Sequence, residues 1–154
     1  MRTFWRISEH ADLSGQGGKI AGARWHTKGR PVVYLTESPA SAMLERIVHL
    51  LDDDDGDLPA YYQLLEISAP DDVAVINLNA IAQTEWRETP WFTRQLGDRW
   101  LASSETPLAR VPSAVAPRTH NYLLNLEHPD ATKVKIEASI RERFDNRLFH
   151  FGAG

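Results

Sequence analysis

The feature that most constrains the fold is an extended apolar run that leads at once into a helix signal. Residues 32–36, VVYLT, are rich in β-branched and aromatic side chains and predict a strand. Ser38 is a suitable helix N-cap, and Pro39 suits the first helical position because its fixed φ is already helical. Apolar residues then recur at helical spacing, which predicts a helix that ends near Asp52. The apolar stripe of this helix comprises Ala40, Met43, Leu44, Ile47, Val48 and Leu51.

Further strands and one more helix are spread irregularly along the chain. Thr89 and Pro90 open the second predicted helix, which runs through residue 101. The glycine-rich segment 14–18 is expected to be a flexible loop, and the acidic run at 52–55 a solvated one. Because strands and helices do not alternate regularly, the sequence favours an α+β domain over a doubly wound one. Extended segments are expected at residues 3–7, 22–25, 61–67, 73–78, 108–115, 121–126 and 133–136.

Size and charge limit what the chain can do. With 154 residues, the chain is expected to form one domain, 1–154, around one core. The formal net charge of −4 argues against direct nucleic-acid binding, since phosphate contacts demand a basic face. No apolar stretch approaches the roughly 20 residues that cross a bilayer, and the polar N-terminus lacks a secretory signal, so a cytoplasmic location is expected. Because cysteine is absent and the six histidines lack ligand spacing, no metal site is expected.

Three polar residues in the first half of the chain are candidates for a binding pocket. Arg24 suits bidentate phosphate recognition, or it is a surface arginine near aromatic rings. Tyr34 lies in the middle of the strand, so its side chain faces opposite to those of its two neighbours. There it either stacks on a planar ring or belongs to the core with its hydroxyl hydrogen-bonded. Glu45 lies roughly 120° from the apolar stripe, on a flank that borders a cleft. Alternatively, Glu45 is a surface residue that pairs with His49 one turn on.

The second half adds a further set. Ser113, in RVPSAV, lacks the G-x-S-x-G setting of a hydrolase nucleophile, so its hydroxyl is expected to form hydrogen bonds rather than attack a substrate. Asn125 and His128, in NLEHPD, either line a site or cap a turn. An arginine, a tyrosine, a glutamate and a serine framed by apolar segments suit a ligand with phosphate and ribose groups.

The order of five short motifs resembles the RES domain family. They are G-x-R-W at 22–25, G-x-x-V-V-Y at 29–34, S-x-x-x-A-x-L-E at 38–45, V-P-S-A-V at 111–115 and N-Y-L-L-N-x-x-H-P at 121–129. The resemblance extends from FWRIS near the start to DNRLF near the end. The family is named for an arginine, a glutamate and a serine, which correspond to Arg24, Glu45 and Ser113, with Tyr34 as its pocket tyrosine.

The resemblance implies a fold similar to that of ADP-ribosyltransferase toxins and a role as the toxin of a type II toxin–antitoxin pair. Such toxins deplete NAD by hydrolysis or phosphorolysis at the nicotinamide–ribose bond, so NAD is the substrate and no other cofactor is implied. Arg24, Tyr34 and Glu45 would be the catalytic set, and Arg24, Tyr34, Ser113 and Asn125 would bind the substrate. The implied partner is an Xre-like helix-turn-helix antitoxin whose C-terminal segment blocks the pocket.

Other functions remain open at this point. The same pocket would serve an ADP-ribosyltransferase that modifies a protein. A non-catalytic partner-binding module, in which the polar residues are only structural, is an alternative of another class. The acidic balance disfavours a ribonuclease. A homodimer is also compatible with the sequence.

Overall fold

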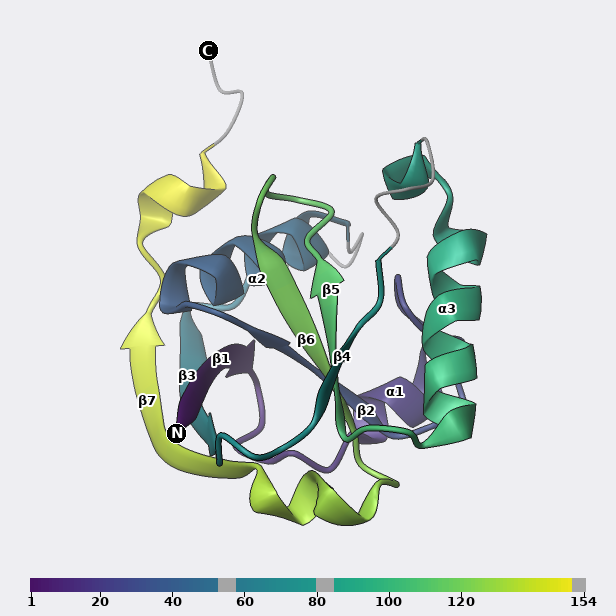
Figure 1. Cartoon of the computed structure of the whole chain (residues 1–154). Helices are drawn as coiled ribbons and strands as arrows, with labels where there is room; N and C mark the ends of the chain where they lie inside the picture. The colour runs from purple at the N-terminus through teal and green to yellow at the C-terminus, as the bar shows by residue number, and fades with distance from the viewer. Residues whose placement is uncertain (53–57, 80–84, 151–154) are drawn as a thin grey trace.

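A sheet of seven strands organises the part of the chain that the computed structural model describes, residues 1–52, 58–79 and 85–150. The strands are β1 (Arg2–Ser8), β2 (Val32–Thr36), β3 (Tyr61–Ala69), β4 (Val75–Asn77), β5 (Leu108–Pro112), β6 (His120–Asn125) and β7 (Lys135–Arg143). They lie in the order β4-β5-β6-β2-β1-β3-β7 (Figure 1). Strands β4 and β5 are parallel, and the other neighbours are antiparallel. The α+β class expected from the sequence is confirmed.

The strands at residues 32–36 and 121–126 were predicted closely, whereas other strands differ in length, β4, β5 and β7 most of all. Strand β7 has nine residues, although the sequence indicated an extended segment only at 133–136. It pairs with β3 along its length, so tertiary pairing supports a charged stretch that strand propensity alone does not indicate. Strand β5 ends at Pro112 rather than at residue 115, because the chain turns back onto the Ser113 hydroxyl there.

Two long helices were predicted correctly, and one short helix was missed. Helices α2 (Pro39–Asp52) and α3 (Pro90–Ser103) begin at the prolines expected to open them. Helix α1 (Gln16–Ile20) occupies the segment expected to be a flexible loop, so that prediction is wrong. Its Gly18 lies so close to β2 that an added Cβ would stand 2.8 Å from Val32 Cγ1. Glycine therefore serves close packing here rather than flexibility. Short 3₁₀ turns lie at Trp86–Glu88, Pro129–Lys133 and Asn146–Phe149.

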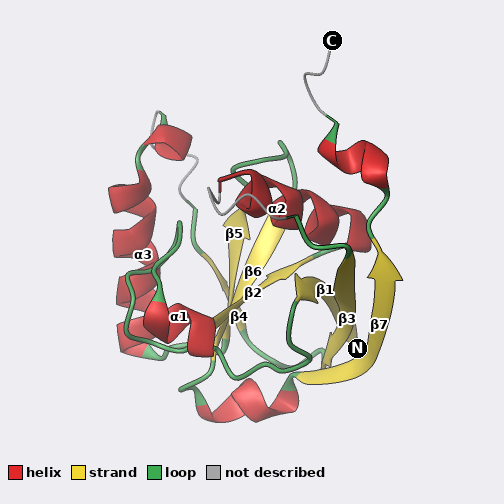
Figure 2. Cartoon of the chain, turned by 180° about the vertical axis from the view of Figure 1, so that it is seen from behind, coloured by secondary structure: helices red, strands yellow, loops and turns green. Residues whose placement is uncertain are grey.

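The sheet carries an apolar cluster on each face. The register sets Tyr34 opposite Leu123 and Val33 opposite Leu124, so neighbouring residues of β2 belong to different clusters. Helix α3 covers one cluster and α1 packs on β2, as the view from behind shows (Figure 2). The first cluster includes Phe4, Leu35, Leu65, Ile67, Leu108 and Leu124. The second includes Trp25, Trp86, Trp100, Leu101, Val111 and Leu123.

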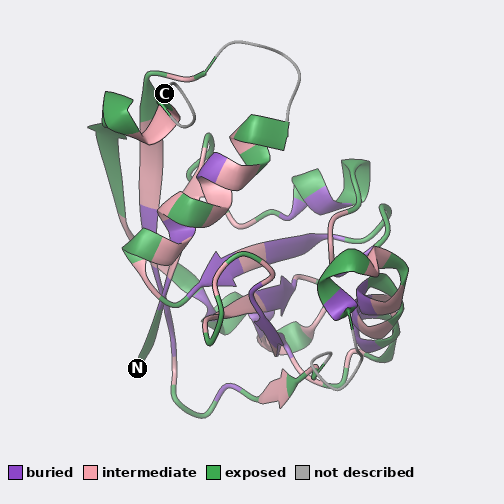
Figure 3. Cartoon of the chain, turned by 90° about the horizontal axis from the view of Figure 1, so that it is seen from above, coloured by how far each residue is buried: buried purple, intermediate pink, exposed green. Residues whose placement is uncertain are grey.

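Helix α2 is turned away from the orientation that its apolar stripe predicted. Ala42 and Ile47 are its buried residues, whereas Leu44 and Leu51 are 40% and 57% exposed. Figure 3 shows how buried, intermediate and exposed residues are distributed along the described chain. Part of the predicted stripe therefore faces outward, whereas Glu45 is half-buried on the flank that borders the cleft, as one of the two sequence-based interpretations expected. The helix has this orientation because α2 packs on β1 and β2 at the end of the sheet, where one of its sides borders the cleft instead of the apolar core.

The expected solvated acidic run falls largely outside the described residues, since only Asp52 of that run is described. Among the helices in the described ranges, none is both long and apolar enough to span a bilayer.

Candidate active site

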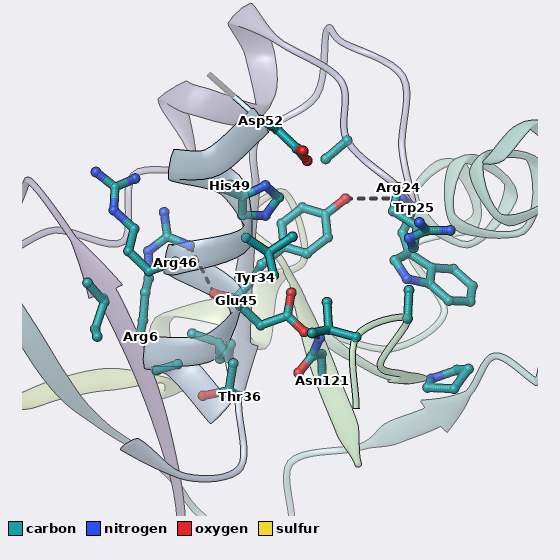
Figure 4. A pocket seen from close by; sticks show the side chains of 18 of the residues that line it. Arg6, Arg24, Trp25, Tyr34, Thr36, Glu45, Arg46, His49, Asp52 and Asn121 are labelled. Atoms are coloured by element: carbon teal, nitrogen blue, oxygen red, sulfur yellow. Dashed lines mark hydrogen bonds between the residues drawn. The ribbon is translucent and has the colours of Figure 1, made fainter. Parts of the chain in front are cut away.

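A cleft of about 550 Å³ opens between α2, the adjoining ends of β2 and β6, and the segment that carries Arg24 (Figure 4). Its volume is in the range of small-molecule sites. Arg24, Tyr34 and Glu45 all line it, so the structure brings together three residues that the sequence singled out. Its other polar lining residues include Arg6, Thr36, Arg46, His49, Asp52, Arg94 and Asn121.

The carboxylate of Glu45 is held by one of its two oxygens. Oε1 accepts a hydrogen bond from Ser113 Oγ at 3.0 Å and another from Asn121 Nδ2 at 2.9 Å. In the described part of the chain no donor is bonded to Oε2, which leaves this oxygen for a ligand. The two donors come from the ends of β5 and β6, so Glu45 is positioned by the sheet and not by its own helix.

Ser113 contributes to this site indirectly. Its side chain is buried, 2% exposed, and its oxygen accepts hydrogen bonds from the backbone N–H groups of Val115 and Ala116, both at 3.1 Å. The hydroxyl proton is therefore directed to Glu45. Ser113 lies behind Glu45 and does not line the cleft, so its position suits orienting the carboxylate rather than contacting a ligand.

Tyr34 forms part of the cleft wall with its hydroxyl already hydrogen-bonded. Its Oη lies 2.7 Å from His26 Nδ1 and accepts a hydrogen bond from the Trp25 N–H at 3.3 Å. Burial raises the pKa of the Tyr34 hydroxyl well above its usual range, so the side chain is a neutral phenol. The sequence offered no signal for His26, because a histidine next to a tryptophan has no motif of its own.

Arg24 lies across the cleft from Glu45, with Tyr34 between them (Figure 4). Its Nη1 donates to the carbonyl oxygen of Arg87 at 2.9 Å, and its other N–H groups leave donors for a ligand. Burial lowers the pKa of the Arg24 guanidinium, while the nearby charge of Glu45 opposes that change. Arginine stays protonated under such shifts, so Arg24 is a fixed positive charge.

Helix α3 holds the backbone around Arg24 in place. Thr93 Oγ1 donates to the carbonyl oxygen of Arg24 at 2.5 Å, and Arg94 Nε donates to that of Ala23 at 2.9 Å. Arg94 also lines the cleft, where it adds a second positive charge beside Arg24. The short extended piece expected at residues 22–25 is reduced in the structure to an isolated bridge between Ala23 and His26.

A glycine allows this helix to approach so closely. A Cβ added at Gly97 would stand only 1.6 Å from the carbonyl oxygen of Trp25, so no larger residue fits. One residue later, Asp98 accepts hydrogen bonds from the N–H and the hydroxyl of Thr27 at 2.9 and 3.0 Å. The backbone on both sides of Trp25 is thereby fixed against α3.

Arg6 and Arg46 make the cleft more cationic, and the sequence did not indicate either of them. Arg6 Nη1 donates to the carbonyl oxygen of Tyr34 at 2.9 Å. Burial, and then the charge of Arg46, lower the pKa of the Arg6 guanidinium. Arginines outnumber the carboxylates of Glu45 and Asp52 in this lining, which suits an anionic ligand.

The structure does not bring Asn125 or His128 to the cleft. Asn125 is 1% exposed, and its amide donates to Ser104 Oγ at 3.2 Å while its oxygen accepts from the Glu127 N–H at 3.1 Å. His128 caps a 3₁₀ turn by accepting from the Asp130 N–H. Asn121 is the asparagine of β6 that reaches the cleft. It lies on the same face as Asn125 but four residues earlier, about 13 Å along the strand.

Within residues 1–52, 58–79 and 85–150, no group of three or more histidine, aspartate or glutamate side chains is arranged to hold a metal ion.

Comparisons with known proteins identify relatives that match nearly the whole chain. The family model of the RES domain matches residues 3–146. "Toxin Res" of Pseudomonas putida is 48% identical over 148 residues, which cover 95% of this chain and 99% of that protein. "Prs ADP-ribosylating toxin" of Sphingobium sp. is 36% identical and covers 95% of this chain and 96% of its own length. The crystal structure of the M. tuberculosis MbcT–MbcA toxin–antitoxin complex contains a similar fold, with a TM-score of 0.68 and 22% identity over 92% of this chain and 84% of that one.

Proposed function

The chain belongs to the RES domain family, and from that premise we propose that it is the toxin of a toxin–antitoxin pair and consumes NAD by cleaving the nicotinamide–ribose bond. The toxin assignment is supported by a relative 48% identical over nearly the whole chain that is named a toxin. The reaction is supported by the cleft, where a held carboxylate faces a cluster of arginines. That juxtaposition of Glu45 with Arg24 is the observation that carries the proposal.

The chemistry of the bond explains the need for Glu45. Loss of nicotinamide builds positive charge on the ribose, as in glycosidases. A carboxylate that is already oriented stabilises this charge without having to reorganise as it develops. Ser113 and Asn121 supply that orientation through Oε1 and leave Oε2 to meet the ribose.

The arginines and Tyr34 account for binding. The guanidinium groups of Arg24 and Arg94 would neutralise the pyrophosphate, since arginine pairs with phosphate oxygens in a bidentate manner. Tyr34 would hold the nicotinamide end of the substrate against the cleft wall. Placing the ribose next to Glu45 in this way supplies a large share of the rate.

The acceptor of the ADP-ribosyl group distinguishes three forms of this proposal. Water yields ADP-ribose, phosphate yields a phosphorylated ADP-ribose, and a protein side chain yields a modified protein. Transfer to a protein is the second candidate, because a relative 36% identical is named an ADP-ribosylating toxin. Chromatography of the products from NAD labelled in the adenosine half, with and without phosphate and with a bacterial lysate, separates the three.

The proposal also includes an antitoxin partner of the Xre-like type and a cytoplasmic site of action, where NAD is available. The chain in the MbcT–MbcA complex has a similar fold, and that complex pairs a toxin with an antitoxin. Co-expression with a neighbouring helix-turn-helix protein is expected to relieve growth arrest and to yield a stable complex on purification.

Glu45→Gln is the decisive variant for the reaction. The amide oxygen of glutamine still accepts from Ser113 and Asn121, so the fold is retained while the charge is lost. We expect wild type to release nicotinamide from NAD, and Glu45→Gln to bind NAD yet to turn it over at least roughly a hundredfold more slowly, because a neutral amide no longer stabilises the positive charge that develops on the ribose.

Glu127→Gln is the matched control, since it removes a surface carboxylate that lies 3.6 Å from Arg30. This control should keep wild-type turnover. A wild-type protein that arrests growth while cellular NAD stays constant and no protein becomes ADP-ribosylated would instead support a non-catalytic binding module. Unchanged turnover in Glu45→Gln would remove Glu45 from the mechanism.

A further inference from the structure

His26 is buried beside the cleft wall, 1% exposed, and uses both of its ring nitrogens. Nε2 lies 3.1 Å from the carbonyl oxygen of Gly18, and Nδ1 lies 2.7 Å from the Tyr34 hydroxyl. A carbonyl oxygen only accepts hydrogen bonds, so Nε2 must carry a proton. In the neutral ring, Nδ1 is then an acceptor, and the Tyr34 O–H donates to it.

This arrangement determines how Tyr34 meets a ligand. Its proton is committed to His26, and one lone pair accepts from the Trp25 N–H at 3.3 Å. No other donor among the described residues is bonded to the Tyr34 oxygen, which leaves one lone pair free. Because burial keeps the phenol protonated, the oxygen does not become a charged phenolate.

We propose that His26 is a positioning residue that makes Tyr34 a hydrogen-bond acceptor toward the substrate. The cleft then selects a substrate that carries an N–H or O–H donor at this point. This inference rests on the proposed function, under which the donor is either the carboxamide N–H of nicotinamide or a ribose hydroxyl. Without His26 the Tyr34 hydroxyl could rotate and donate to the ligand, and the selection would be lost.

Helix α1 carries the carbonyl group that lies against His26 Nε2, although the sequence indicated no helix there. The Gly18 carbonyl that holds Nε2 also accepts from the Gly29 N–H at 3.4 Å, so it is anchored from two sides. Gly18 itself cannot bear a side chain, since a Cβ would stand 3.0 Å from the carbonyl oxygen of Arg30. The carbonyl that selects the tautomer is therefore held firmly against β2.

A double-mutant cycle tests whether His26 acts through the Tyr34 hydroxyl. His26→Leu removes the acceptor, whereas the Oδ1 atom of asparagine in His26→Asn can take the place of Nδ1. We expect His26→Leu to lower kcat/KM for NAD by roughly tenfold or more, as for a lost buried hydrogen bond, and His26→Asn to recover most of it. In the Tyr34→Phe background, His26→Leu should cost less than about twofold, because coupled residues are not additive. An equal loss in both backgrounds would overturn the proposal.

Substrate analogues identify the donor. Nicotinic acid adenine dinucleotide lacks the carboxamide N–H groups, and deoxyribose analogues of NAD lack one hydroxyl each. Wild type is expected to prefer NAD strongly over one of these classes, and His26→Leu should reduce that preference by roughly tenfold. If His26→Leu reduces the preference for NAD over the acid analogue, the donor is the carboxamide N–H. If it reduces the preference for NAD over a deoxy analogue, the donor is the ribose hydroxyl. If His26→Leu alters neither ratio, the proposal fails.

The tautomer itself can be measured without turnover. Nitrogen-15 NMR of the imidazole in wild-type protein is expected to show His26 protonated at Nε2 and unprotonated at Nδ1. A protonated Nδ1 would overturn the inference even if NAD is cleaved. Conversely, a wild-type protein that releases no nicotinamide but shows the expected tautomer would count against the proposed function and not against the arrangement of His26 and Tyr34.

Discussion

The hydroxyl of Ser113 donates a 3.0 Å hydrogen bond to Glu45 Oε1, although 68 residues separate them in the sequence. The serine lies just beyond the end of β5 and the glutamate lies on α2, so the sheet orients a carboxylate that a helix carries. Glu45 and Ser113, which the resemblance matches to two of the residues for which the family is named, are thus hydrogen-bonded to each other. Arg24 faces Glu45 across the cleft (Figure 4).

Ser113→Ala is expected to lower nicotinamide release by roughly tenfold to a hundredfold, because Glu45 loses one of its two orienting donors. It should also destabilise the fold by about 1–3 kcal/mol, since the N–H groups of Val115 and Ala116 lose their acceptor. Steady-state kinetics and urea denaturation measure the two effects. Ser139→Ala, at an exposed position on β7, should change neither, and full activity in Ser113→Ala would contradict its orienting role.

Asn121→Asp is expected to lower turnover further than Asn121→Ala does. Both variants remove the amide that donates to Glu45, but the aspartate also places a second negative charge beside it. Two such charges about 4 Å apart repel by about 4 kcal/mol at an effective dielectric constant of about 20, so the difference should be at least roughly tenfold. Asn77→Asp, exposed at the end of β4, is the control for the added charge. Equal turnover in the two Asn121 variants would argue against a charged Glu45 carboxylate.

Gly97→Ala should damage both stability and activity, since its Cβ would overlap the carbonyl oxygen of Trp25. Pushing α3 away from this segment costs about 1–3 kcal/mol and displaces Arg24, so KM for NAD should rise. Gly17→Ala is a matched control in α1, where a Cβ meets no atom within 4 Å. The control should be neutral or stabilise by about 0.5–1 kcal/mol, as expected for alanine in a helix. Thermal melting and initial rates would show the contrast, and wild-type behaviour of Gly97→Ala would refute such close packing.

Tyr34 is expected to ionise well above the ordinary tyrosine pKa of about 10 in an alkaline titration, because burial raises the pKa of its hydroxyl. The unfolded chain then releases this proton at lower pH than the native protein. Stability should therefore fall as pH rises above about 10, and it should fall less steeply in Tyr34→Phe. Ultraviolet absorbance of tyrosinate follows the ionisation. If the component that Tyr34→Phe removes from the titration lay near pH 10 or below, the burial of this hydroxyl would be contradicted.

Asn125→Ala should destabilise the protein without altering its kinetics. Its side chain is buried at the end of β6 remote from Asn121, and the change leaves the Glu127 N–H without its acceptor, at a cost of about 1–3 kcal/mol. Because Asn125 does not line the cleft, kcat and KM per folded molecule should stay within about twofold of wild type. Denaturation curves and kinetics on the same preparation measure both. If Asn125→Ala raised KM without changing stability, Asn125 would have to contact the ligand after all.

Short-range signals in the sequence were sufficient for several elements. The β-branched run before Ser38 and Pro39 predicted both β2 and the start of α2, because strand propensity and helix capping depend on neighbouring residues. The same locality explains one error and one gap. The glycines at 15, 17 and 18 predict a flexible loop where helix α1 lies, and the apolar stripe of α2 does not indicate which of its residues are buried. Both properties depend on segments that are distant in the sequence. The neighbouring strand decides whether a glycine is needed for close packing, and the elements under a helix decide whether its face meets the core or a cleft.

The sequence by itself determined the α+β class and, through its ordered motifs, the family with Arg24, Tyr34, Glu45 and Ser113 as the residues of interest. Only the tertiary structure decided their relations: Ser113 donates to Glu45 instead of lining the cleft, and His26 is hydrogen-bonded to Tyr34. Asn121, and not Asn125, lies in the cleft lining. The physical reason is that a hydrogen bond depends on atoms brought within about 3 Å. Sheet register and helix packing bring these atoms together across dozens of residues, and no local pattern encodes that proximity.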